Sequence, residues 1–225
     1  MGMFPDFIFV AALLLTLALV PFIAVLATSY TKIVIVLGLL RMALGTQQVP
    51  PNLVINGVAI VMTLFIMAPI AIKAQEVVEK QVSAASVKGE QKAPSFQDFL
   101  KARDAVLPPL RQFLRKNVRE RELQFFLKTA TTLWPEEYAK KASADDLLIL
   151  VPSFTISELS EAFMIGFVIY LVFVVVDLVV STVLLSMGMA MISPTTISIP
   201  FKLLLFVALD GWSRLLQGLV IGYAR

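Results

Sequence analysis

The sequence contains no cysteine and no histidine, which removes most of the residues that enzymes and metal sites use. Without cysteine the chain has no disulfide and no thiolate site. Without histidine it lacks the commonest general base and the commonest metal ligand, so Ser-His-Asp, Cys-His and His-containing zinc arrangements cannot form. No glycine-rich phosphate loop or dinucleotide fingerprint is present. We therefore expect no enzyme activity, no catalytic residue, no cofactor and no metal.

Charge is the second scarcity, because only 16% of the residues are charged, against about 25% in a soluble domain. The stretch from Lys73 to Asp146 holds 14 Lys/Arg and 11 Asp/Glu, and the rest of the chain holds 5 of each kind. A mixed and nearly balanced segment is typical of a solvated domain. The net charge of +3 is therefore a poor argument for nucleic-acid binding.

Apolar residues make up 58% of the chain and occur in long runs. Phe7 to Ala27 and Leu53 to Ile72 carry no charge, and Asp177 is the only charge between Glu161 and Lys202. A hydrocarbon core of about 30 Å needs about 20 such residues in a helix. The sequence thus predicts an integral membrane protein with at least three hydrophobic segments.

The pattern predicts an all-α fold of membrane-associated helical hairpins with a small soluble helical insertion. We divide it into N-terminal hydrophobic helices (1–72), the insertion (73–146, with a flexible linker at 83–94) and C-terminal hydrophobic helices (147–225). Within the insertion, Pro108-Pro109 is expected to separate two helices, and Trp134-Pro135 to end the second. The last apolar region, from Ile197 to Tyr223, is expected to form one helix.

Orientation follows from the short loops. The residues before Phe7 carry no basic side chain, so the first apolar run is interpreted as a retained helix rather than a signal peptide. Lys32 and Arg41 lie between the first two long hydrophobic helices, and the positive-inside rule places that connection in the cytoplasm. The insertion and both termini then lie on the periplasmic side of the bacterial inner membrane.

Charged residues inside the apolar runs need partners, because an unpaired charge at membrane depth is costly. Lys202 is the natural partner for Asp177, either as a fixed ion pair or as part of a proton relay. Glu158 or Glu161 could pair with Arg115 or Arg119 of the insertion. Lys202, Asp210 and Arg214 would share one face of a continuous last helix and should face protein or water, although Lys202 and Arg214 could instead snorkel from its ends.

The segment from Ser186 to Pro194 is rich in methionine. Met187, Met189 and Met191 cannot share one face of a helix, but they do share one face of an extended segment. Gly188 and Pro194 disfavour helix there, and irregular backbone at membrane depth is tolerated only inside protein or beside a water-filled path. The side chains could line a shared cavity as a deformable seal, or they could simply pack in a core.

Several runs of residues resemble the R/P component of the type III secretion export apparatus, a family shared by virulence injectisomes and the flagellar export gate. The resemblance covers nearly the whole chain and is weakest from Ser83 to Phe96. Its main runs are Thr28 to Val34, Leu39 to Asn52, Met67 to Pro69, Ser157 to Leu159, Ala162 to Phe167, Asp177 to Val179, Met187 to Met189, Ser198 to Phe206 and Asp210 to Trp212.

The resemblance implies a homo-oligomer, a pentamer, that forms a helical pore with the S and T components and passes unfolded proteins. Its other implied partners are the larger export gate protein, the basal body and membrane lipid, with no nucleic acid. It implies a pore gasket of Met187, Met189 and Met191, although Ala190 stands where many relatives have methionine. Structural ion pairs carry over to Asp177 with Lys202 and to Arg119 with Glu158.

The lack of a signal peptide, Leu133-Trp134-Pro135 and the run from Asp210 to Leu215 favour an injectisome member over a flagellar one. Two other classes stay open. A proton-coupled secondary transporter would use Asp177 beside a broken helix near Pro194. A pure assembly scaffold would need no open path.

Overall fold

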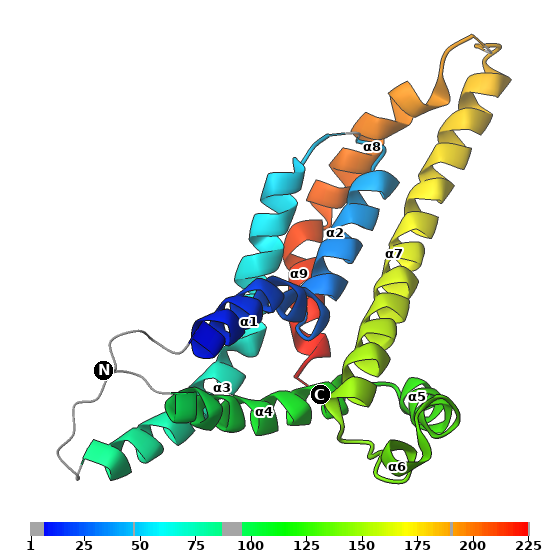
Figure 1. Cartoon of the computed structure of the whole chain (residues 1–225). Coiled ribbons are helices and arrows are strands. Elements are labelled where there is room, and N and C mark those ends of the chain that lie inside the picture. The colour runs from blue at the N-terminus through cyan, green and yellow to red at the C-terminus, as the bar shows by residue number, and fades with distance from the viewer. Residues whose placement is uncertain (1–6, 47, 87–95, 190, 225) are drawn as a thin grey trace. The chain divides into compact units, whose positions relative to one another are not determined.

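The computed structural model describes residues 7–46, 48–86, 96–189 and 191–224, and within these ranges it contains helices and no strand. This confirms the predicted all-α fold. Figure 1 shows the elements in chain order. Their bounds are α1 (Phe7–Leu26), α2 (Tyr30–Ala43), α3 (Asn52–Ser86), α4 (Phe96–Asn117), α5 (Glu120–Leu133), α6 (Glu136–Ala139), α7 (Leu147–Ser186), α8 (Pro194–Ala208) and α9 (Gly211–Gly222).

The chain divides into two compact units, and the long helices α3 and α7 contribute to both. Unit 1 comprises Met1–Ser29 and Met67–Ser157, and unit 2 comprises Tyr30–Ile66 and Glu158–Arg225. Unit 1 thus contains α1, α4, α5 and α6, whereas unit 2 contains α2, α8 and α9.

Two helices are long and apolar enough to cross a membrane: Asn52–Lys73 within α3, and the whole of α7. The pair α8 and α9 also qualifies if the two are taken as one broken span, since they are bent by 60°. The predicted membrane class is therefore supported by helices of sufficient length and hydropathy among the described residues.

In unit 2 the core forms around one face of α2. Ile33, Val36, Leu37 and Leu40 recur at helical spacing and are at most 1% exposed. The first three pack with residues of α3, α7 and α9, such as Ala59, Ala162 and Leu219, whereas Leu40 packs in a neighbouring cluster with residues of α7 and α8. The helix ends at Ala43, and Gly45 adopts a φ of 76°, a conformation that favours glycine.

Unit 1 has its own core between α4, α5 and the start of α7. Leu114, Leu123 and Phe154 are fully buried there, and the Phe113 and Phe154 rings lie 5.6 Å apart. The end of α1 joins the same unit, because the Thr155 hydroxyl donates a hydrogen bond to the Leu26 carbonyl at 3.1 Å.

The predictions based on proline are correct at Pro21 and Pro135 and wrong at Pro108-Pro109. Pro21 lies inside α1, as expected, and Trp134 caps the end of α5 before Pro135. The predicted break at Pro108-Pro109 is wrong, because both prolines lie within α4. Proline has a helical φ, so a helix can continue through it, although it removes one hydrogen-bond donor and its ring crowds the carbonyl four residues earlier. The chain instead breaks at Val118 and Arg119.

Helix α3 extends into the first residues of the predicted linker. Helix α3 continues to Ser86, so residues 83–86 are helical. This run contains two alanines, which favour helix, and no breaker. Residues 87–94 of the predicted linker lie outside the described residues.

The last apolar region is two helices rather than the predicted single helix. Asp210 adopts left-handed backbone (φ 52°, ψ 45°), which stops α8 and starts α9 in a new direction. Asp tolerates this conformation better than most residues because its short side chain can bond locally, and here it accepts a hydrogen bond from Ser213. Lys202 and Arg214 therefore lie on different helices and cannot share one helical face.

Candidate functional site

The first polar site joins three helices of unit 2 through Lys202. Its ammonium group lies 2.7 Å from Asp177 Oδ2 on α7, and it donates a 3.2 Å hydrogen bond to the carbonyl of Ala43 at the end of α2. The Ser198 hydroxyl donates to the other Asp177 oxygen at 2.6 Å. The predicted partners Asp177 and Lys202 are thus brought together in one chain.

Burial in this site is uneven. The Lys202 side chain is 4% exposed and that of Asp177 is 40% exposed. Ala43 supplies one of the last carbonyls of α2, which have no partner within their own helix and favour a cation. The buried ammonium group of Lys202 is therefore compensated by the Asp177 carboxylate and the Ala43 carbonyl. The Asp177 side chain itself remains partly exposed.

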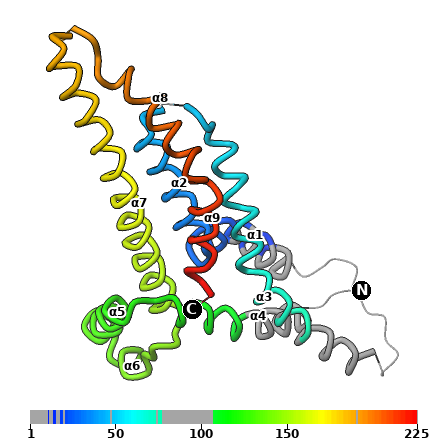
Figure 2. The backbone as a smooth tube through the Cα atoms, turned by 180° about the vertical axis from the view of Figure 1, so that it is seen from behind, coloured from blue at the N-terminus to red at the C-terminus, as the bar shows by residue number. Residues whose placement is uncertain are grey.

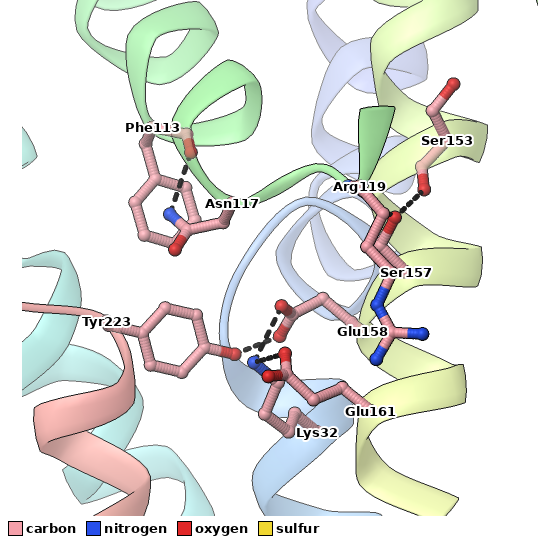
Figure 3. A network of polar contacts seen from close by, with 9 residues as sticks. All are labelled: Lys32, Phe113, Asn117, Arg119, Ser153, Ser157, Glu158, Glu161 and Tyr223. Atoms are coloured by element: carbon pink, nitrogen blue, oxygen red, sulfur yellow. Dashed lines mark hydrogen bonds and ion pairs between the residues drawn. The ribbon is translucent and has the colours of Figure 1, made fainter. Parts of the chain in front are cut away.

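The second polar site surrounds Glu158 and lies entirely in unit 2 (Figure 3). Lys32 Nζ lies 2.9 Å from Glu158 Oε1 and 2.7 Å from Glu161 Oε2. The first contact is an ion pair without hydrogen-bond geometry. The Tyr223 hydroxyl donates a hydrogen bond to the other Glu158 oxygen, and its ring centroid lies 4.2 Å from Lys32 Nζ.

Two carboxyl groups, those of Glu158 and Glu161, share the one ammonium group of Lys32 in this site. The side chains of Lys32 and Glu158 are 7% and 0% exposed, whereas that of Glu161 is 46% exposed. Burial raises the pKa of Tyr223, and the negative charge of Glu158 acts in the same direction. Tyr223 therefore remains a protonated donor, and Lys32 provides the compensating charge for the buried carboxylate.

The predicted partners of Glu158 in the insertion lie in the other unit. The Arg119 amide donates a 3.0 Å hydrogen bond to the Ser157 hydroxyl, and Arg115 pairs with Glu120 at 3.1 Å. Figure 3 shows Arg119 and Ser157 together with the Asn117 side chain, which donates to the Phe113 carbonyl at 2.8 Å. Because Arg119 belongs to unit 1 and Glu158 to unit 2, the predicted pair of these side chains stays a prediction.

The methionine segment forms the turn between α7 and α8. Gly188, with a φ of 75°, donates its amide to Leu185, and the Met189 amide donates to Leu184. This double pattern ends a helix with a left-handed glycine. The Ile192 amide then donates to the Met189 carbonyl at 3.2 Å, which closes a second turn. The segment is therefore folded into turns rather than extended as predicted.

All three methionines point away from the core of the chain. Their exposed fractions are 61% for Met187, 39% for Met189 and 101% for Met191. The described residues of what we call the methionine turn, 187–189 and 191–193, lie at the end of α7 and the start of α8 in both views (Figures 1 and 2). Ala190 lies outside the described residues.

The family of the chain follows from comparison with known proteins. A family model described as the FliP family matches residues 13–219. The chain belongs to the FliP family. The motif resemblance is thereby confirmed, and this FliP-family chain is a component of a type III secretion export apparatus that associates with the membrane.

Curated relatives of this FliP-family chain match over almost their whole length. It is 51% identical to "Pathogenicity-related ORF2" of Xanthomonas campestris pv. glycines, with 92% of each chain covered. It is 48% identical to "Yop proteins translocation protein R" of Yersinia pestis, with 97% of each covered. It is 45% identical to "Hypersensitivity response secretion protein HrcR" of Ralstonia nicotianae, with 97% of this chain and 98% of the relative covered.

Sequence reasoning missed Lys32 and Tyr223 as partners of Glu158. The positive-inside rule concerns only the side of the membrane on which Lys32 lies and says nothing of its partner. Tyr223 lies 65 residues from Glu158 along the chain. A usable signal existed, because an isolated lysine just before the apolar run of α2 needs a counter-ion in the bundle. No comparable signal marked Tyr223.

Proposed function

We propose that this chain is a pore-forming core subunit of a type III secretion export gate. Several copies, five by the family resemblance, surround a central channel that passes unfolded secreted proteins. The S and T components complete the pore, and the larger export gate protein and the basal body adjoin it. The assembly belongs to the bacterial inner membrane, with the insertion and both termini on the periplasmic side.

The observation that carries this proposal is the exposure of the methionine turn. Met187, Met189 and Met191 are large apolar side chains, yet they are among the exposed ones of the single chain. Apolar groups presented together on a surface indicate a partner. Thioether side chains adapt their shape to what they touch, so a ring of such turns closes around an axis and yields to a passing chain.

The Asp177–Lys202 site joins the two helices that carry the methionine turn. Asp177 lies nine residues before the end of α7 at Ser186, a distance of about 14 Å at the helical rise. The ion pair at 2.7 Å links α7 to α8, the two legs that carry the turn. Both Asp177 oxygens already have partners, which favours a fixed clamp over a proton relay.

The names of the relatives favour an injectisome over a flagellar gate. One relative is named a translocation protein for Yop proteins, and another a secretion protein of the hypersensitivity response. Identity of 45% or more over nearly the whole of each chain makes a shared role in export of virulence proteins the simplest interpretation.

The seal is tested by replacing all three methionines of the turn. In a reconstituted export gate, Met187→Ala, Met189→Ala and Met191→Ala together should raise resting ion permeability, because the small side chains leave the channel open. The same three positions changed to Leu should remain closed, since leucine keeps the apolar volume.

Exposed methionines outside the turn provide the matched control. Met42 on α2 and Met164 on α7 are 65% and 57% exposed. Their change to Ala should leave resting permeability unchanged. A triple alanine variant of the turn that assembles and does not leak would refute the seal and favour a scaffold without an open path.

A further inference from the structure

An apolar groove in unit 2 has no role in the function proposed above. It has a volume of about 250 Å³ and is formed by α2, α7, α8 and α9. Leu40, Val172, Phe173, Phe206 and Leu209 are among the side chains that line it. An apolar cavity of about 150 Å³ already admits benzene, so this groove has room for a hydrocarbon group.

Arg214 is the only charged residue that lines this groove. It lies in the first turns of α9, is exposed, and forms no ion pair with any residue that the structure describes. The carboxylate nearest in sequence, that of Asp210, instead accepts a 2.9 Å hydrogen bond from Ser213. Of the three charges in the last apolar region, Lys202 and Asp210 thus have partners, and Arg214 has no counter-ion among the described residues.

An unpaired guanidinium beside apolar walls is an unfavourable arrangement in a membrane-associated protein. Its cost falls when an anion binds, and the five N–H donors of arginine match a phosphate oxygen pair. The groove therefore combines one anion-binding group with a path for hydrocarbon. An amphiphile with one phosphate next to an acyl chain has the same combination.

We propose that this groove binds an anionic membrane phospholipid, with an acyl chain against Leu40 and Phe173 and the phosphate on Arg214. The apolar face of a second copy is a poorer fit, because it offers no negative charge to the Arg214 guanidinium at the groove. The proposal goes beyond the pore function and does not depend on it. It concerns unit 2 alone.

The test uses the purified full-length chain in a neutral detergent, titrated with phosphatidylglycerol, with phosphatidylcholine and with inorganic phosphate. Lipid binding is followed by native mass spectrometry and by the shift in thermal unfolding. Phosphatidylglycerol should bind at least tenfold more tightly than phosphatidylcholine, because hydrogen bonds to a charged group contribute a factor of that order. Inorganic phosphate should give no measurable shift.

Variants that should weaken or strengthen the preference for phosphatidylglycerol provide a second test. Arg214→Gln should lose the preference for phosphatidylglycerol, and Arg214→Lys should retain part of it. Asp210→Asn should strengthen the preference, because a neighbouring negative charge is removed while Asn tolerates left-handed backbone. Arg111→Gln changes an exposed arginine of unit 1 and should have no effect.

The groove itself is tested by Val172→Trp, which fills it from a position that is 51% exposed and so should not disturb folding. This variant should bind both lipids more weakly. Equal binding of the two lipids, an Arg214→Gln variant that keeps the preference, or a phosphate response equal to that of the lipid would each overturn the proposal. The proposal would also be overturned if position 214 cross-linked to a second copy of the chain in an assembled complex that contains no lipid.

Discussion

Gly166 on α7 allows a close approach to α2 that no larger residue permits. A Cβ atom built at Gly166 would lie 2.2 Å from Leu39 Cδ1 and 2.9 Å from Leu39 Cβ. A rotamer change of Leu39 can move the first atom. It cannot move the second, because Cβ is fixed to the backbone. Gly166→Ala should therefore force α2 and α7 apart.

The magnitude follows from two opposing effects. Overpacking a tight contact costs about 1–3 kcal/mol. Alanine in place of glycine within a helix contributes about 1 kcal/mol in the other direction. We expect Gly166→Ala to lower the free energy of unfolding by up to about 2 kcal/mol, as the difference of these effects.

Gly57 supplies the matched control, because it also lies inside a helix of unit 2 and a Cβ atom there meets nothing within 4 Å. Gly57→Ala should leave stability unchanged or raise it by up to about 1 kcal/mol. Both variants are measured by denaturant unfolding of the isolated chain in detergent micelles. The comparison requires the same transition slope in both variants.

A double substitution tests the cause. If the clash with Leu39 is responsible, Leu39→Ala should cost less in the Gly166→Ala background than in the parent chain, because it also relieves the overpacking. Additive effects of the two substitutions, or a Gly166→Ala variant as stable as Gly57→Ala, would refute the proposed contact.

Five further substitutions follow from the two charge sites, each measured by the same unfolding assay. Asp177→Asn should destabilise by about 1–3 kcal/mol, because the buried Lys202 ammonium loses its counter-charge and keeps the Ala43 carbonyl as an acceptor. Lys202→Met should cost less, since Asp177 is 40% exposed and keeps its bond to Ser198, and an equal or larger loss would contradict this reasoning. Lys32→Met should cost about 3–5 kcal/mol, because it leaves the fully buried Glu158 without its counter-charge. Glu161→Gln should change stability by about 0–1 kcal/mol, because Glu161 is half exposed. A larger loss for Glu161→Gln than for Lys32→Met would refute the assignment of Lys32 as the counter-charge of Glu158. Tyr223→Phe should lower the free energy of unfolding by about 1–3 kcal/mol, because it leaves a buried Glu158 oxygen without its donor. If this variant is as stable as the parent chain, the Lys32 pair alone suffices and the role given to the Tyr223 hydroxyl is wrong.

The sequence alone was sufficient for properties that depend on local composition. Long uncharged runs indicated membrane helices, because the thickness of the hydrocarbon core sets a minimum length. The pairing of Asp177 with Lys202 could be anticipated because so few charges occur in the C-terminal apolar region that the choice of partner was narrow. Gly188 and Pro194 correctly indicated a break between α7 and α8.

Only the tertiary structure decided which distant groups meet. Glu158 contacts Lys32 and Tyr223 because α2, α7 and the end of α9 pack together, and spacing along the chain does not encode that contact. The bend at Asp210 separated Lys202 from Arg214, although the Asp-Gly dipeptide was a local signal that could have suggested it. Burial likewise depends on neighbouring helices. Only the folded chain therefore shows that Lys32 is buried whereas Glu161 is half exposed.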